Sequence, residues 1–325
     1  MNTNNWQSEL DRVLNKWDGK YIVTSPDVDG LISAAILKSA FNAEICGIYS
    51  TRYLFILDGY DRDSCKQALW VDHDISDPDI QCLGQHLVLH SPGNTLPLRN
   101  PDSFNPNIFF PQYFTGSFHG VRGVKKDKYP FATCHFLLHL ATPPEEFSDE
   151  EISLLAHADG SFANVHRYRQ NCDIWFGLMF QSSKPMRAIC GGKYLDGDNY
   201  HQAHSMLVRR LIEAGINKRS SQTSQRAIPR RWEALIGHQS IPFRKGQDSD
   251  IFIRKVNNVV RVIADISRFD AGKLGHVKEI LAGEVETPYP DFLNKANFDS
   301  FMVEKKIFSH AFVSNRQLRY TTDLF

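Results

Sequence analysis

The sequence predicts an α/β protein, with a doubly wound, mostly parallel sheet in its main domain and a second, smaller α+β domain after it. Short apolar runs rich in β-branched residues alternate with helical patterns, which is typical of parallel strands joined by helices. Several of these runs end in aspartate or histidine. The stretch 217–231 is polar and basic and predicts a linker. We therefore expect one domain at residues 1–215, a linker or loop at 216–231, and a second domain at 232–325 that is a candidate for substrate binding.

Each element is predicted from its local pattern. In the main domain, helices are expected at 6–17, 31–41, 130–141, 148–158 and 201–214, and strands at 21–24, 43–49, 54–57, 68–71 and 86–89. Ser148 and Glu151 form a capping box at the start of the fourth helix. In the second domain, strands are expected at 251–256, 259–266 and 307–313, and a helix at 273–282.

The strand at 21–24 leads into a turn that holds two carboxylates, Asp27 and Asp29, before the next helix begins. No lysine or arginine in this segment neutralises them. Ligands of an open parallel sheet bind at the carboxyl ends of its strands. The turn therefore predicts either a cation site or, for one of the two aspartates, a helix N-cap.

Other potential ligands follow later elements. Asp72 follows the strand at 68–71, His90 follows the run 86–89, and Asp159 follows the fourth helix. With the two earlier aspartates, they make a set of four carboxylates and one imidazole. Such a set suits Mn²⁺ or Mg²⁺ better than zinc, which more often takes cysteine and several histidines. Two such ions, bridged by an aspartate, would polarise a phosphoryl oxygen and lower the pKa of a water, which is the two-metal route to phosphoester hydrolysis.

The composition argues against several classes of protein. Lysine plus arginine and aspartate plus glutamate each number 37, so no net charge attracts nucleic acid or membranes. The six cysteines include no CxxC pair, which argues against a zinc ribbon or a disulfide framework. No window approaches the roughly 18 apolar residues of a membrane span, and the N-terminus lacks a signal-peptide core. We therefore expect a cytoplasmic protein without a membrane partner.

The motifs and their order resemble the DHH phosphoesterase family, which includes RecJ-like exonucleases and nano-RNases. Ser-Pro-Asp-Val-Asp-Gly-Leu-Ile-Ser at 25–33 resembles the first motif, D-x-D-x-D-G-x-x-S, and Val-Asp-His-Asp-Ile at 71–75 resembles the second. Leu-His-Ser at 89–91 stands where the family has Asp-His-His, and an Asn-Pro turn at 105–106 follows it, as in the RecJ branch. Ala-His-Ala-Asp at 156–159 resembles the fourth motif.

The resemblance implies a hydrolase of phosphoester bonds, a phosphoesterase or nuclease that uses two Mn²⁺ or Mg²⁺ ions. The implied metal ligands are Asp27, Asp29, Asp72, His90 and Asp159. Asp72 would bridge the ions, and Ser91 would contact the scissile phosphate. The implied substrate is single-stranded nucleic acid, a short oligonucleotide or a nucleotide. A homo-oligomer or a partner protein is compatible with this interpretation.

The third motif is degenerate, because Leu89 and Ser91 replace the aspartate and the second histidine of the family pattern. The second domain also lacks the family's glycine-rich substrate-binding signature. The sequence therefore supports an alternative of another class: a catalytically inactive DHH-fold protein that binds a nucleotide or serves as a partner subunit.

Other residues have both a functional and a structural interpretation. His73 and Asp74 are candidates for contacts to the ligands or the substrate, and His119 for the role of the missing histidine. His135 and His139 have the i, i+4 spacing of a metal site, but their apolar helix favours a core position. The basic residues at 209–231 would either line a channel for a single strand or lie in a solvated loop.

Overall fold

The structure is a computed structural model, and the chain divides into two compact units, each built from three segments. We name them the helical unit (residues 1–4, 25–43 and 130–276) and the sheet unit (residues 5–24, 44–129 and 277–325). The structure describes residues 5–87, 100–110, 128–141, 146–191, 197–216, 241, 243–244, 246–286, 298–314, 317–322 and 324–325. The boundary expected at 216–231 falls inside the segment 130–276 of the helical unit, and residues 217–231 lie outside the described ranges.

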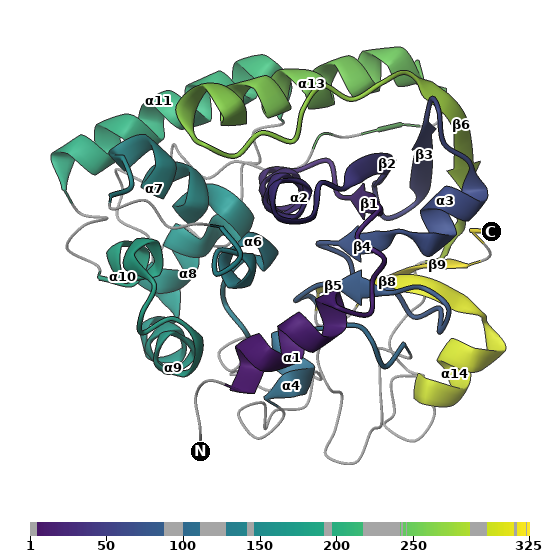
Figure 1. Ribbon diagram of the computed structural model, residues 1–325, viewed down its shortest axis with the longest axis horizontal. Helices are drawn as coiled ribbons and strands as arrows, with labels where there is room; N and C mark the ends of the chain where they lie inside the picture. The colour runs from purple at the N-terminus through teal and green to yellow at the C-terminus, as the bar shows by residue number, and fades with distance from the viewer. Residues whose placement is uncertain are drawn as a thin grey trace. The chain divides into compact units, whose positions relative to one another are not determined.

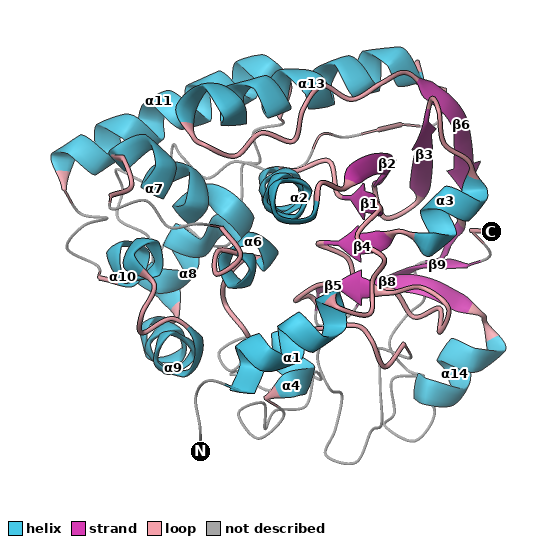
Figure 2. Ribbon diagram, in the orientation of Figure 1, coloured by secondary structure: helices cyan, strands magenta, loops and turns pink. Residues whose placement is uncertain are grey.

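The main sheet of the sheet unit has six strands in the order β5-β4-β1-β2-β3-β6. Its strands are β1 (Tyr21–Thr24), β2 (Glu44–Tyr49), β3 (Tyr53–Leu57), β4 (Leu69–Val71), β5 (Cys82–Leu83) and β6 (Val277–Ala282). Neighbouring strands from β5 to β2 pair in parallel, whereas β3 and β6 add antiparallel pairs at one edge (Figure 2). The prediction of an α/β protein with a mostly parallel sheet is therefore confirmed.

The sheet unit also contains a small antiparallel sheet of order β7-β9-β8. Its strands are β7 (Glu284–Glu286), β8 (Ile307–Ser314) and β9 (Gln317–Thr322), and the unit's helices are α1 (Asn5–Leu14), α3 (Arg62–Gln67), α4 (Pro106–Phe109) and α14 (Phe298–Glu304). Phe308 of β8 packs edge-on against Trp70 of β4, and the Tyr49 hydroxyl lies 2.6 Å from Ser309 Oγ. These contacts bring the C-terminal strands into the same core as the first strands.

The described part of the helical unit is built of helices (Figure 1). They are α2 (Val28–Phe41), α6 (Thr133–Leu137), α7 (Asp149–His157), the short 3₁₀ turn η2 (Ala158–Gly160), α8 (Ser161–Arg167), α9 (Arg169–Met179), α10 (Lys184–Cys190), α11 (Asp198–Ala214) and α13 (Ser249–Ile266). The residues from Val28 to Leu37 of α2 are all buried, as expected of a helix that is apolar on every side. The capping box predicted at α7 is confirmed, since Ser148 Oγ accepts from the Glu151 N–H at 3.1 Å.

Four sequence-based predictions of local structure are wrong, and each has a physical reason. The strands expected at 251–256 and 259–266 both belong to α13, where buried Phe252, Val256, Val259 and Ile263 recur with a helical period. The helix expected at 273–282 is replaced from 277 by β6, whose side chains alternate between half-buried and exposed and which pairs with β3.

The strand expected at 86–89 is also wrong where the structure describes it, because the chain there is irregular at residues 86 and 87. The strand of this region is β5, which ends at Leu83. Leu87 is nevertheless buried in the core of the sheet unit. An apolar residue at that position therefore reflects packing from a loop and not strand structure.

The second domain expected at 232–325 is distributed over both units. Its helix α13 belongs to the helical unit, and its strands β6 to β9 belong to the sheet unit. Within the described residues, no helix is long and apolar enough to cross a membrane.

Candidate functional site

The carboxyl ends of β1, β4 and β5 lie at one edge of the main sheet, since Thr24 pairs with Val71 and Val71 pairs with Leu83. Asp72 follows β4 directly and has a left-handed backbone conformation with φ of 60°. This conformation costs a non-glycine residue about 1–2 kcal/mol, although aspartate tolerates it better than most residues. The side chain of Asp72 therefore starts from the ligand-binding edge that the sequence predicts.

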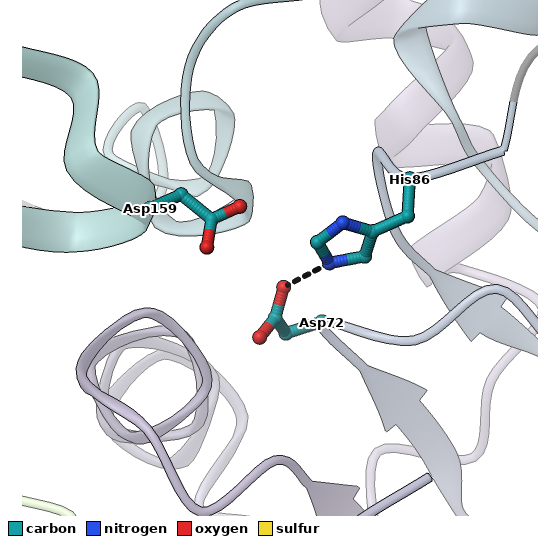
Figure 3. A group of neighbouring side chains, drawn as sticks. All are labelled: Asp72, His86 and Asp159. Carbon is teal, nitrogen blue, oxygen red and sulfur yellow. Dashed lines mark hydrogen bonds and ion pairs between the residues drawn. The ribbon is translucent and has the colours of Figure 1, made fainter. Parts of the chain in front are cut away.

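His86 follows β5 by three residues and lies beside Asp72 (Figure 3). Its Nε2 atom is 3.3 Å from Asp72 Oδ1. The Asp72 side chain is 2% exposed, whereas the His86 side chain is 39% exposed. The pair thus combines a buried carboxylate with an imidazole that reaches solvent. A carboxylate oxygen and an imidazole nitrogen are donors that suit a divalent ion such as Mn²⁺.

The histidine of this pair is not the one that the sequence analysis selected. His90 and Ser91 lie in the stretch 88–99, outside the described residues, so their roles stay predictions. His86 was missed because β5 has only two residues and gives no recognisable strand pattern. The signal available in the sequence was the polar group Gly84-Gln85-His86 directly after the short apolar pair Cys82-Leu83.

His73 and Asp74 continue the chain from Asp72 and are both buried. Burial, together with the smaller effect of the neighbouring His86, lowers the pKa of His73 to about 3. The His73 ring packs edge-on against Tyr49, with ring centroids 5.1 Å apart. Asp74 accepts hydrogen bonds from the backbone of the loop that carries His86. Both residues therefore support the edge of the sheet from within the sheet unit.

Asp27 and Asp29 belong to the helical unit, and both accept hydrogen bonds from backbone N–H groups there. Asp27 is the N-cap of α2, accepting from the Gly30 N–H at 2.9 Å and from Ser25 Oγ at 2.7 Å. Asp29 is fully buried, and its two oxygens accept from the N–H groups of Thr133 and Cys134, each at 2.7 Å. The N-cap considered for this turn is thus realised at Asp27, and Asp29 fixes the start of α6.

Asp159, which Figure 3 also draws, belongs to the helical unit. It follows α7 in the turn η2, with φ of 50°, and Gly160 continues the left-handed turn with φ of 63°. This turn gives Asp159 a half-buried position at the end of a buried helix. The predicted location at an element end is therefore confirmed, and its role as a ligand stays a prediction.

The remaining candidates are placed as follows. His135 is a buried core histidine: its Nδ1 accepts from the Ala132 N–H at 3.1 Å, and its Nε2 donates to the Leu155 carbonyl at 2.9 Å. Both nitrogens are used, so the i, i+4 histidine pair does not present His135 to a metal. His119 and residues 217–231 lie outside the described residues, and Arg210 of α11 pairs with Asp265 of α13 at 2.9 Å.

Comparisons of the chain with protein-family models, with curated proteins and with solved structures give no significant match. The fold and the site define an α/β protein with an aspartate–histidine pair at the carboxyl edge of its sheet. The resemblance to DHH phosphoesterases depends on the sequence motifs.

Proposed function

We propose that this chain is a metal-dependent phosphoesterase that hydrolyses phosphodiester bonds in single-stranded nucleic acid, short oligonucleotides or nucleotides. The observation that carries the proposal is the Asp72–His86 pair, which lies at the carboxyl ends of two neighbouring parallel strands. Asp72 stands in the second motif of the resemblance, and His86 stands close to the position of the third.

The donor set of the sheet unit fits a divalent ion. Asp72 and His86 would hold it through one oxygen and one nitrogen, since the imidazole nitrogen already faces the carboxylate at 3.3 Å. When bound, Mn²⁺ or Mg²⁺ would polarise the phosphoryl oxygen and lower the pKa of a water. The exposed face of His86 gives a substrate phosphate access to this edge. The left-handed backbone conformation of Asp72 sets the direction in which its side chain leaves the end of β4. For Asp27 and Asp159, ligation stays a prediction from the motif order.

The proposal is tested by turnover with Mn²⁺ and with Mg²⁺ on labelled single-stranded DNA, single-stranded RNA, short oligoribonucleotides and cyclic dinucleotides. Asp72→Asn and His86→Gln keep the size of each side chain and remove a ligand. We expect both variants to lose at least about 100-fold in kcat, since each removes a group that acts on the reacting atoms. The matched control is Asp79→Asn, which changes an exposed aspartate between β4 and β5, in the segment that begins with Asp72. This variant should keep full activity. Full activity in Asp72→Asn would disprove the site.

A specific observation favours the alternative, an inactive DHH-fold protein that binds a nucleotide or a partner. Asp29, one of the implied ligands, is fully buried and accepts from two backbone N–H groups and from Ser33 Oγ. Its oxygens are thus engaged in holding α6. The alternative predicts that nucleotides bind without turnover for any divalent ion, and calorimetric titration with the same substrates would distinguish the two functions.

A further inference from the structure

The loop that carries His86 is held to the rest of the sheet unit through its backbone. The Gly84 N–H donates to the Phe104 carbonyl at 3.1 Å, and Asn107 Nδ2 donates to the Gln85 carbonyl at 2.8 Å. These bonds fix the first half of the loop. Its second half, which contains His86 and Leu87, is held at its backbone N–H groups by a carboxylate.

That carboxylate belongs to Asp74, whose side chain is buried beneath the loop. Its Oδ2 atom accepts from the His86 N–H at 2.7 Å and from the Leu87 N–H at 3.0 Å. Its Oδ1 atom accepts from Asn105 Nδ2 at 2.7 Å. Hydrogen bonds to a charged acceptor are about twice as strong as neutral ones, so the three together define one position for the loop.

Gly84 shows how closely the loop approaches Asp74. A Cβ atom added at Gly84 would lie 2.6 Å from Asp74 Cγ, from Asp74 Oδ1 and from the His73 carbonyl oxygen. Side-chain carbon atoms do not approach other atoms so closely, and here the obstacles include backbone. Glycine is therefore the residue that allows the loop to rest on the carboxylate.

Asn105 completes the arrangement from the other side. Its Nδ2 also donates to the Leu87 carbonyl at 3.2 Å, and its Oδ1 accepts from the Asn107 N–H at 2.8 Å as the N-cap of α4. Asp74 and Asn105 thus satisfy the N–H and the C=O of Leu87 together. The Asn-Pro turn predicted at 105–106 is the N-terminus of α4, which explains why an asparagine stands there.

We propose that Asp74 is a positioning residue that holds the backbone of His86 so that its imidazole faces Asp72. The catalytic consequence of this inference depends on the proposed function, because Asp74 would set the geometry of Asp72 and His86, the candidate metal ligands. Asp74 acts through the loop and not as a ligand, since its oxygens accept three hydrogen bonds from within the sheet unit. Groups that orient metal ligands typically change metal affinity by 10–100-fold when removed.

The test compares three variants of the full chain. Asp74→Asn keeps the shape of the side chain but replaces one acceptor oxygen by an N–H₂ group. In either orientation of the amide, this donor faces another donor: the loop N–H groups or the N–H₂ of Asn105. The exchange variant Asp74→Asn/Asn105→Asp restores a donor–acceptor pair between residues 74 and 105, where aspartate also serves as an N-cap, but it loses the hydrogen bond from Asn105 Nδ2 to the Leu87 carbonyl. Asp79→Asn removes the same charge from an exposed position of the segment between β4 and β5, which also contains Asp74.

Two readouts separate positioning from a general effect on folding. The first is the ¹⁵N and ¹H signals of the His86 side chain in the metal-free protein, assigned with His86→Gln. The second is the affinity for Mn²⁺, measured by electron paramagnetic resonance well below the unfolding temperature. We expect Asp74→Asn to shift the His86 signals and to weaken Mn²⁺ binding by at least about 10-fold. The exchange variant should recover only part of both, since it lacks the donor to the Leu87 carbonyl. Asp79→Asn should change neither.

Unchanged His86 signals in folded Asp74→Asn would overturn the inference, whatever the activity. If Asp74→Asn does not fold, Asp74→Glu carries the test, because it keeps the charge but moves the carboxylate by one methylene group. Unchanged His86 signals in folded Asp74→Glu would overturn the inference too. A wild-type protein that binds no Mn²⁺ and hydrolyses nothing would refute the proposed function alone, because the His86 signals of the metal-free protein still report the positioning.

Discussion

The carboxylate of Asp29 and the backbone N–H of Thr133, 104 residues apart in the chain, are joined by a hydrogen bond of 2.7 Å. The Cys134 N–H donates to the other oxygen at the same distance. Asp29 therefore holds the first turn of α6 against α2 inside the helical unit.

Replacing Asp29 with alanine should destabilise the helical unit. The change leaves two buried N–H groups without their acceptor, so we expect the free energy of unfolding to fall by about 3 kcal/mol. Urea denaturation followed by circular dichroism measures this. Asp58→Ala, at an exposed aspartate whose Oδ1 accepts from the adjacent Gly59 N–H, is the control and should stay within about 0.5 kcal/mol of wild type. An Asp29→Ala protein as stable as wild type would show that the contact to α6 contributes nothing.

The left-handed conformation of Asp72 predicts an unusual order of stability among its variants. Alanine is strained at φ of 60° and glycine is not, so Asp72→Gly should be more stable than Asp72→Ala by about 1 kcal/mol. The same two substitutions at Asp77, whose φ is not positive, should give the reverse order or no difference. Thermal unfolding of the four variants measures these differences in stability. Equal stabilities of Asp72→Gly and Asp72→Ala would contradict the left-handed backbone conformation at residue 72.

Introducing a side chain at Gly84 should disturb the loop that carries His86. Because the new Cβ would lie 2.6 Å from Asp74 and from the His73 carbonyl, Gly84→Ala should lower the free energy of unfolding by about 1–3 kcal/mol. Gly177→Ala in α9 meets nothing within 4 Å and should instead raise it by about 0.5–1 kcal/mol. Chemical denaturation of the two variants checks the opposite signs. A stabilising Gly84→Ala would contradict the close approach of the loop to Asp74.

Two buried histidines of the helical unit predict a loss of stability in acid. Burial lowers the pKa of His157 and of His135 from 6.5 to about 4, and the His157 ring lies against that of His204, with centroids 5.4 Å apart. A folded-state pKa below the unfolded value means that stability is complete above about pH 6.5 and is lost as the pH falls through 4. Each histidine accounts for up to about 3 kcal/mol of that loss.

The measurement is urea denaturation at a series of pH values from 7.5 to 4.5. His157→Leu removes one ionisable group and should flatten the profile by about 3 kcal/mol between these limits. His276, which is exposed, supplies the matched control as His276→Leu and should leave the slope unchanged. A profile of His157→Leu parallel to that of wild type would exclude His157 as a source of the acid sensitivity.

The sequence by itself determined the elements whose pattern is local. The strand at 21–24, the capping box at Ser148 and the helix that ends at Ala214 follow from neighbouring residues, and the structure confirms them. Asp72 was also selected from a local pattern, because it directly follows an apolar strand of three residues.

The tertiary structure decided what depends on residues far apart in the chain. Strand β5 is too short to be recognised alone and exists because Cys82 and Leu83 pair with β4, so the choice of His86 followed from the sheet and not from the sequence. Residues 251–266 contain many β-branched residues, which led to the prediction of strands, although Phe252, Val256, Val259 and Ile263 recur with the helical period of α13. The two oxygens of Asp29 could not be assigned to α6 from the sequence, since hydrogen bonds across 104 and 105 residues are set by packing and leave no local pattern.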